Sequence, residues 1–181
     1  MIEAALGLID EHGVDGFSLA QAAREAGVSV AAPYRHFENK RALLNEVAIF
    51  GFGELGRRLR DIDDHRTGDA VADLTELGLG YIEFAIARPP LFTVMFVNRG
   101  RDAQSTAGLA SLSVLGEAVG RLAAVGRLTV PPETAVPALW AQVHGLAMLQ
   151  LGGMRTITET DSPERRRSLL RPLLLGGILT P

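Results

Sequence analysis

The chain has 181 residues, of which 47% are hydrophobic, so it is long enough to bury a sizeable core in one or two compact units. It contains no cysteine, which excludes disulfides and thiolate metal sites and permits a reducing cytoplasm. The net charge is -3, and residues 1–60 hold seven basic and eight acidic side chains, so a nucleic-acid partner would have to be recognised through local placement of charge.

Charged residues interrupt every apolar stretch, and no run approaches the roughly 18 apolar residues that a helix needs to span a bilayer. The first residues also lack the charged and then apolar pattern of a signal peptide. We therefore expect a soluble, cytoplasmic protein with no membrane partner.

The residue pattern of the N-terminal third of the chain predicts four helices. The first is an amphipathic segment that ends near Gly13. Ser18 and Gln21 have the spacing of a capping box, which predicts the start of a second helix that Gly27 ends. A third helix is expected over residues 29–37 and a fourth over about 40–60.

The rest of the chain also predicts helices, after a polar link over residues 61–68. Proline pairs at 89–90 and 131–132 mark breaks, and strict alternation of apolar and polar residues does not persist over the length of a strand. The fold class is therefore all-α, with a helix-turn-helix head over residues 1–60 and a larger helical domain over 61–181. The later helices are expected at 69–88, 90–97, 102–126, 132–152 and 162–178.

Two short helices joined by the tight turn at Gly27 form a helix-turn-helix, in which the second helix enters the DNA major groove. The polar side chains of that helix are Tyr34, Arg35 and His36, and all three can bond phosphate oxygens. Lys40 is expected in the first turn of the fourth helix, where its ammonium and the helix N–H groups could converge on one phosphate.

The string Gly27-Val28-Ser29-x4-Tyr34-Arg35-His36-Phe37-x-Asn39-Lys40-x2-Leu43 resembles the head of TetR-type (tetracycline-repressor) regulators. The resemblance covers about residues 2–60. It implies a larger helical domain that binds a small effector and forms a dimer, and it implies repression. Family members usually carry a basic arm before the first helix, whereas this sequence begins with the helix itself, so we expect either a start further upstream or an affinity that depends unusually on the helices. By position, the resemblance implies that Ser18, Ser29, Tyr34, His36 and Lys40 contact the DNA backbone and that Val30, Ala31, Ala32 and Arg35 face the groove.

Three of these four groove-facing residues are small and apolar, so they can touch thymine methyl groups but cannot form bidentate hydrogen bonds to a base. We therefore expect sequence preference to depend on Arg35, on Tyr34 and on DNA shape.

The C-terminal half offers a weaker signal, since Trp140, His144 and Gly145 resemble an element of one large TetR-type subgroup. A sensor needs an apolar cavity with few polar groups, so we expect a mostly apolar or aromatic effector. The same residues could instead pack in the core. The leucine-rich helix 162–178 and helix 132–152 are the expected homodimer interface. The candidate pocket residues are Phe84, Phe92, Met95, Phe96, Trp140 and His144.

Two other classes of function remain open. Gly51, Gly53 and Gly56 match the G-x-G-x-x-G pattern of a nucleotide-binding enzyme, but a helical pattern precedes them where that site requires a strand. A helical module that binds only protein is the other alternative. The four histidines are scattered and no nucleophile motif is visible, so we expect neither enzymatic activity nor a metal or cofactor.

Overall fold

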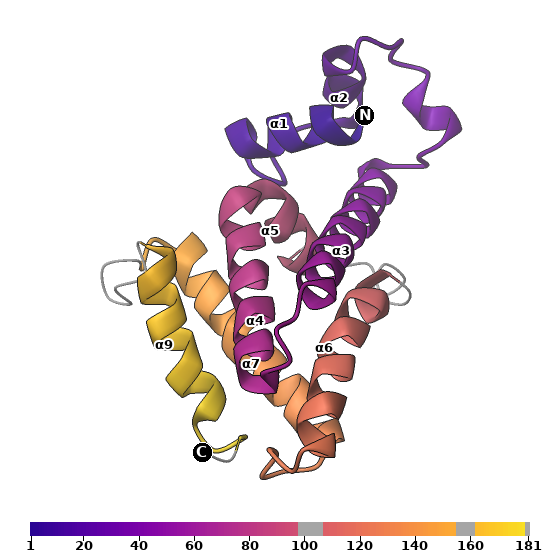
Figure 1. Cartoon of the computed structure of the whole chain (residues 1–181). Helices are drawn as coiled ribbons and strands as arrows, with labels where there is room; N and C mark the ends of the chain where they lie inside the picture. The colour runs from indigo at the N-terminus through magenta and orange to yellow at the C-terminus, as the bar shows by residue number, and fades with distance from the viewer. Residues whose placement is uncertain (98–106, 155–161, 180–181) are drawn as a thin grey trace. The chain divides into compact units, whose positions relative to one another are not determined.

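The computed structural model describes residues 1–97, 107–154 and 162–179 (Figure 1). Its described residues fall into two compact units, one formed from residues 1–54 and 88–109 and the other from residues 55–87 and 110–181. The long helix α3 (Lys40–Asp64) contributes its first part to one unit and its last part to the other.

The first unit contains α1 (Ile2–His12), α2 (Leu19–Glu25), the 3₁₀ helix η1 (Pro33–Arg35), the start of α3, and α5 (Pro89–Val97). Helix α1 contacts both α2 and α5. Its apolar residues recur on one face, and that face is buried, as is the matching face of α2. The core therefore holds the N-terminal helices together around small and aliphatic side chains, among them Ala5, Leu6, Ile9, Leu19, Ala22, Ala23, Leu43 and Val47.

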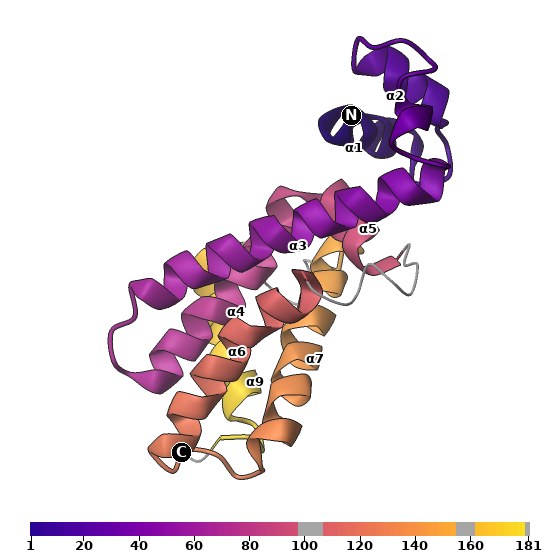
Figure 2. The ribbon, with the colours of Figure 1, turned by 90° about the vertical axis from the view of Figure 1, so that its right-hand side faces the viewer.

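The second unit contains the end of α3, α4 (Ala70–Ala87), most of α6 (Ala107–Ala124), α7 (Pro132–Leu151) and α9 (Pro163–Leu175). Helix α4 is buried on most sides because it packs against both α7 and α9 (Figures 1 and 2). Gly78 allows this close approach, since a Cβ there would lie 2.7 Å from Leu170 Cδ2 and 3.2 Å from Val143 Cγ1.

The all-α class is confirmed, with an isolated bridge between Leu128 and Leu179 as the sole extended pairing in the described residues. None of the described helices is long and apolar enough to cross a membrane. The division into domains at residue 60 stays a prediction, while the contacts divide the chain differently, within α3 after Glu54.

Several predicted helix bounds were wrong. The link predicted at 61–68 begins too early, since α3 continues to Asp64. The helix predicted over 162–178 ends at Leu175 before two glycines, of which Gly177 has a φ of +88°. Helix α6 spans Ala107–Ala124, and residues 102–106 of the predicted 102–126 helix lie outside the described residues.

The largest error concerns the third helix, predicted over 29–37, where η1 occupies three residues. Pro33 has no backbone N–H, so the i→i−4 bond that would link it to Ser29 cannot form. The backbone instead makes successive turns, in which Ala32 N–H donates to Ser29 C=O (2.9 Å) and His36 N–H to Pro33 C=O (2.9 Å). The element that was predicted to enter a DNA groove is therefore shorter and less regular than the sequence pattern suggests.

Candidate functional site

Helix α2 begins with the predicted capping box. The Ser18 hydroxyl oxygen accepts the Gln21 N–H at 3.2 Å, and the Gln21 side-chain oxygen accepts the Ser18 N–H at 2.8 Å. Both side chains are exposed, whereas Leu19 and the two alanines at 22 and 23 are buried. The cap fixes the end of α2 while leaving the Ser18 hydroxyl at the surface.

The turn after α2 depends on Gly27, whose φ is +70°. A Cβ there would meet no atom within 4 Å, so the reason for glycine is the backbone conformation. The Gly27 N–H donates to Arg24 C=O and the Val28 N–H to Ala23 C=O, both at 3.0 Å. These bonds end the helix and direct the chain into the next segment.

We define the reading segment as residues 29–37. Pro33 is buried and anchors it, and the Phe37 N–H donates to Pro33 C=O at 2.8 Å. Phe37 is half-buried, so it fills the core of the head only in part. The segment contains one arginine and one histidine and no carboxylate. Of the residues predicted to contact DNA, Ala32 is half-buried and the following are exposed: Ser29, Val30, Ala31, Tyr34, Arg35 and His36.

Lys40 is the first residue of α3, beside the reading segment in the chain. The Asn39 side-chain oxygen accepts the Ala42 N–H at 3.0 Å, which caps the helix. The Lys40 ammonium lies 4.3 Å from the centre of the Phe17 ring, a cation–π contact. Sequence reasoning missed Phe17, although an aromatic residue directly before a capping serine is the usual signal of a hydrophobic staple.

The predicted pocket residues of α5 lie in the first unit. Phe92 and Met95 are fully buried, and Phe96 is half-buried with its ring 4.7 Å from that of Phe92. The Phe52 ring of α3 lies 5.4 Å from Phe96, edge to face. These contacts account for the side chains as core residues, and their assignment to a ligand pocket stays a prediction.

The other predicted pocket residues lie in the second unit. The Tyr81 hydroxyl of α4 lies 2.8 Å from His144 Nδ1, and the Trp140 indole N–H donates to that hydroxyl at 3.4 Å. If the indole donates to the phenol, the phenol proton is directed to Nδ1, and a neutral His144 carries its proton on Nε2. Phe84 is buried three residues further along α4. Sequence reasoning missed Tyr81, although a tyrosine in an apolar helix generally has a hydrogen-bonding partner.

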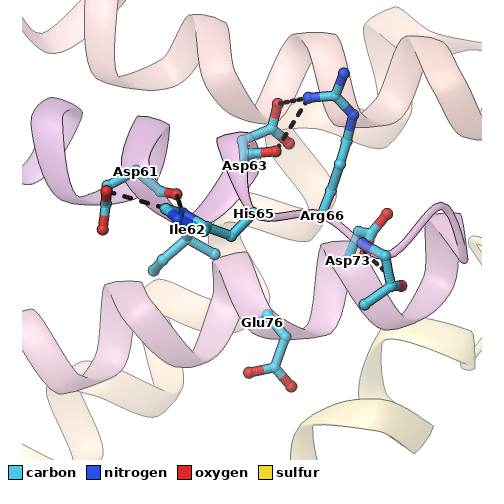
Figure 3. Close-up of a pocket in the computed structure, with 8 residues that line it drawn as sticks. Asp61, Ile62, Asp63, His65, Arg66, Asp73 and Glu76 are labelled. Carbon is cyan, nitrogen blue, oxygen red and sulfur yellow. Dashed lines mark hydrogen bonds and ion pairs between the residues drawn. The ribbon is translucent and has the colours of Figure 1, made fainter.

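A polar pocket of about 330 Å³ lies in the second unit where α3 ends and α4 begins (Figure 3). Asp63, which is 7% exposed, accepts a hydrogen bond from Arg121 and pairs with Arg66. His65 is exposed, and a contact of its Nδ1 with Asp61 C=O together with the Asp61 charge raises its pKa. The pocket lining contains Asp61, Ile62, Asp63, His65, Arg66, Thr67, Asp73 and Glu76.

Asp73 fixes the loop between α3 and α4. Its carboxylate accepts the Thr67 N–H (2.7 Å), the Thr67 hydroxyl (2.8 Å) and the Gly68 N–H (3.1 Å). Burial raises the pKa of Asp73, but these three hydrogen bonds and the charge of Arg121 outweigh it, so the net shift is downward. The buried carboxylates of Asp63 and Asp73 both bond to other groups of the protein. Their presence in the pocket is therefore explained by their role in holding the loop between α3 and α4. In the part of the chain that the structure describes, no group of three or more His, Asp or Glu residues could hold a metal ion.

The glycine motif lies inside α3, after a helical turn and not after a strand, which contradicts the nucleotide-binding alternative. A Cβ at Gly51 would lie 2.6 Å from Met95 Sδ and 2.8 Å from Leu91 Cδ1, so this glycine permits close packing of α5 on α3. A Cβ at Gly53 would meet no atom within 4 Å.

Comparison with known proteins places both parts of the chain in one family. Residues 1–47 match the family described as bacterial regulatory proteins, tetR family, and residues 74–171 match the one described as tetracyclin repressor-like, C-terminal domain. An uncharacterised helix-turn-helix regulator of Bacillus subtilis, YobS, is 30% identical over 89 residues, which are 49% of this chain and 46% of that protein. The class A tetracycline repressor of Escherichia coli is 50% identical over 48 residues, which are 26% of this chain and 22% of that protein.

The chain thus aligns with less than half the length of these curated relatives, but solved structures match throughout. A protein of unknown function from Rhodococcus sp. RHA1 is 31% identical with a TM-score of 0.82, over 98% of this chain and 92% of that one. The regulator FadR from Bacillus subtilis, solved with stearoyl-CoA, is 17% identical with a TM-score of 0.75, over 97% and 96% of the two chains, and shows the shared fold. The chain belongs to the TetR family of helix-turn-helix transcription regulators.

Proposed function

We propose that this protein is a homodimeric, ligand-responsive transcriptional repressor that binds a near-palindromic operator through its reading segment. The observation that carries the proposal is the exposed surface of that segment. Tyr34, Arg35 and His36 project from a short turn that the buried Pro33 anchors, with no carboxylate among residues 29–37. Such a surface fits an anionic duplex, in which phosphate contacts set the position and contacts to bases set the sequence.

Dimerisation through α7 and α9 is supported by the exposed apolar side chains of these two helices. Met148, Leu149 and Leu173 are 38–46% exposed, although they lie on helices whose other faces form the core. Gly145, three residues before Met148, is exposed and has no atom within 4 Å of its Cβ position, which leaves room for a second helix. A two-fold dimer would present two reading segments to successive major grooves, about 34–36 Å apart.

The effector that we propose is small and mostly apolar. The predicted pocket side chains are Phe84, Phe92, Met95 and Phe96, together with Trp140 and His144, which share hydrogen bonds with Tyr81. FadR of Bacillus subtilis was solved with stearoyl-CoA, an apolar acyl chain on a polar carrier, which supports this class of ligand by analogy alone. The effector would release DNA in proportion to its preference for the protein conformation that does not bind the operator.

The test is binding of the full-length protein to the DNA directly upstream of its own gene, measured by fluorescence anisotropy over a series of salt concentrations. Affinity should fall as salt rises because bound counterions are displaced. A panel of hydrophobic small molecules is then screened for release of the DNA. Affinity without salt dependence, or no affinity for any duplex at low salt, would favour the alternative of a protein-binding helical module.

Two substitutions distinguish the residue proposed to contact a base from the residue proposed to contact a phosphate. Arg35→Ala should weaken binding to the upstream duplex about 5- to 150-fold and to a scrambled duplex much less, because a base contact is worth about 1–3 kcal/mol. Lys40→Ala should weaken both duplexes alike and lower the salt slope by about one unit. Arg60→Ala removes an exposed arginine further along α3 and is the matched control. If Lys40→Ala changed sequence preference and Arg35→Ala did not, the assignment of the two residues would be wrong.

A further inference from the structure

We propose that Val28 and Val30 read the 5-methyl groups of thymine, so that each operator half-site contains thymines recognised by apolar contact. The inference rests on the proposed function, since it assigns a base chemistry to the same DNA-binding surface. It goes further by making the thymine methyl a determinant of sequence preference, and by including Val28, which the sequence pattern does not assign to the DNA.

The first observation is an unusual exposure of apolar side chains. Val28 is 43% exposed, Val30 41% and Tyr34 56%, so three large apolar side chains are exposed within seven residues. Ala31, between them, is also exposed. Elsewhere in the first unit the aliphatic side chains of α1 and α2 are mostly buried. Both valines therefore present part of their apolar surface to solvent, and a cluster of exposed apolar residues generally marks a contact with a partner.

The second observation is the charge beside the two valines. Arg35 follows on the same short segment, with the polar His36 beside it, and from Gly27 to Phe37 the chain has no carboxylate. A surface that combines apolar and cationic groups complements a major groove better than it complements a purely apolar partner, because the groove is lined by phosphates and carries apolar groups only where thymine occurs.

The chemistry then limits what can be read. Valine and alanine side chains have no hydrogen-bond donor or acceptor, so they cannot distinguish guanine, adenine or cytosine by their polar edges. In the major groove the apolar group of the four standard bases is the C5-methyl of thymine. Burial of that methyl against a valine favours a T·A pair, and replacement of the methyl by hydrogen should weaken binding about fourfold at each contacted position.

The experiment removes the methyl from the DNA and leaves the protein intact. The probe is a duplex selected from a random library by the full-length protein, in which each thymine is replaced in turn by deoxyuridine. We expect one or two positions in each half-site where wild-type affinity falls about fourfold, and where a 5-methylcytosine·guanine pair, which restores the methyl, binds better than cytosine·guanine.

The protein variants test whether the valines are responsible. Val28→Ala and Val30→Ala should bind the thymine duplex more weakly and lose most of the penalty for deoxyuridine, because the contact is already absent. Val125→Ala is the matched control, since Val125 is 63% exposed directly after α6 and should keep the full penalty. Val28 and Val30 are both exposed, so their truncation should leave the fold intact.

The outcomes separate this inference from the proposed function. A duplex that binds tightly and with salt dependence, but tolerates deoxyuridine at every position, overturns the reading of methyl groups and leaves the DNA-binding function standing. A deoxyuridine penalty that persists in both valine variants also overturns it. If the library yields no bound duplex at all, the proposed function itself fails.

Discussion

Gly51 and Gly53 lie two residues apart in α3 and should respond in opposite ways to alanine. Alanine is favoured over glycine in a helix interior by about 1 kcal/mol at either position. A Cβ at Gly53 would meet no atom within 4 Å, so Gly53→Ala should stabilise the protein by about that amount. A Cβ at Gly51 would lie 2.6 Å from Met95 Sδ and 2.7 Å from its Cγ, and Met95 is fully buried.

The clash at Gly51 sets the size of the difference. Forcing an extra methyl into a packed core costs about 1–3 kcal/mol, which cancels or exceeds the gain in helix propensity. Gly51→Ala should therefore range from neutral to about 2 kcal/mol destabilising, whereas Gly53→Ala should raise the melting temperature by about 2–4 °C for a chain of this length.

Thermal and urea unfolding monitored by circular dichroism measure both variants. In a double-mutant cycle, Met95→Ala should cost less in the Gly51→Ala background than in the wild type, because the added methyl fills part of the space that the methionine leaves. If Gly51→Ala stabilised the protein as much as Gly53→Ala, α5 would have to shift away from the new methyl group at no cost in free energy. Close helix packing could then not be the reason for glycine at position 51.

Three further changes test other parts of the structure. The pKa of Asp73 is lowered in the folded protein, so its contribution to stability is complete above the ordinary value of 3.8 and is lost as pH falls through the lower folded pKa. The difference in urea stability between wild type and Asp73→Asn should therefore be constant near neutral pH and shrink below about pH 4, and a difference that grew with acidity would contradict the role of the Thr67 bonds. Ser18→Ala should cost about 1 kcal/mol in urea unfolding through loss of the cap, and an unchanged stability would mean that the cap contributes nothing. Tyr81→Phe should cost about 0.5–1.5 kcal/mol and change the fluorescence of Trp140, the single tryptophan of the chain, and an identical spectrum would argue against the hydrogen bond between them.

Local signals predicted the parts of the fold that depend on neighbouring residues. The capping box of Ser18 and Gln21 could be predicted because a cap requires only residues three positions apart. The start of α7 at Pro132, and that of α5 to within one residue (expected at 90, found at Pro89), could be predicted because proline suits the first turn of a helix and breaks a preceding one. Gly27 could be assigned to the turn because a left-handed φ depends on the residue itself, and glycine adopts it most readily.

Non-local contacts explain what the sequence pattern missed. The polar run that begins at Asp61 was expected to be a link, yet α3 continues to Asp64 because Asp63 pairs with Arg121, 58 residues away. Tyr81 could not be placed beside His144 without knowing that α4 packs on α7. Pro33 is different, since its missing N–H was visible in the sequence, and the helix over 29–37 was expected only because the surrounding motif suggests one.

The short reading segment also explains how a chain of net charge -3 can be proposed to bind DNA. At an ionic strength of 0.1 M, exposed charges more than about 10 Å apart are largely screened, so the total charge matters less than the side chains that reach the duplex. In the stretch from Gly27 to Phe37 those side chains include Arg35 and His36 and no carboxylate. Few cations and several apolar side chains imply a small number of phosphate contacts, hence a modest salt slope and a larger share of the affinity from apolar contact and DNA shape. The salt slope therefore measures how far this surface departs from a purely electrostatic one.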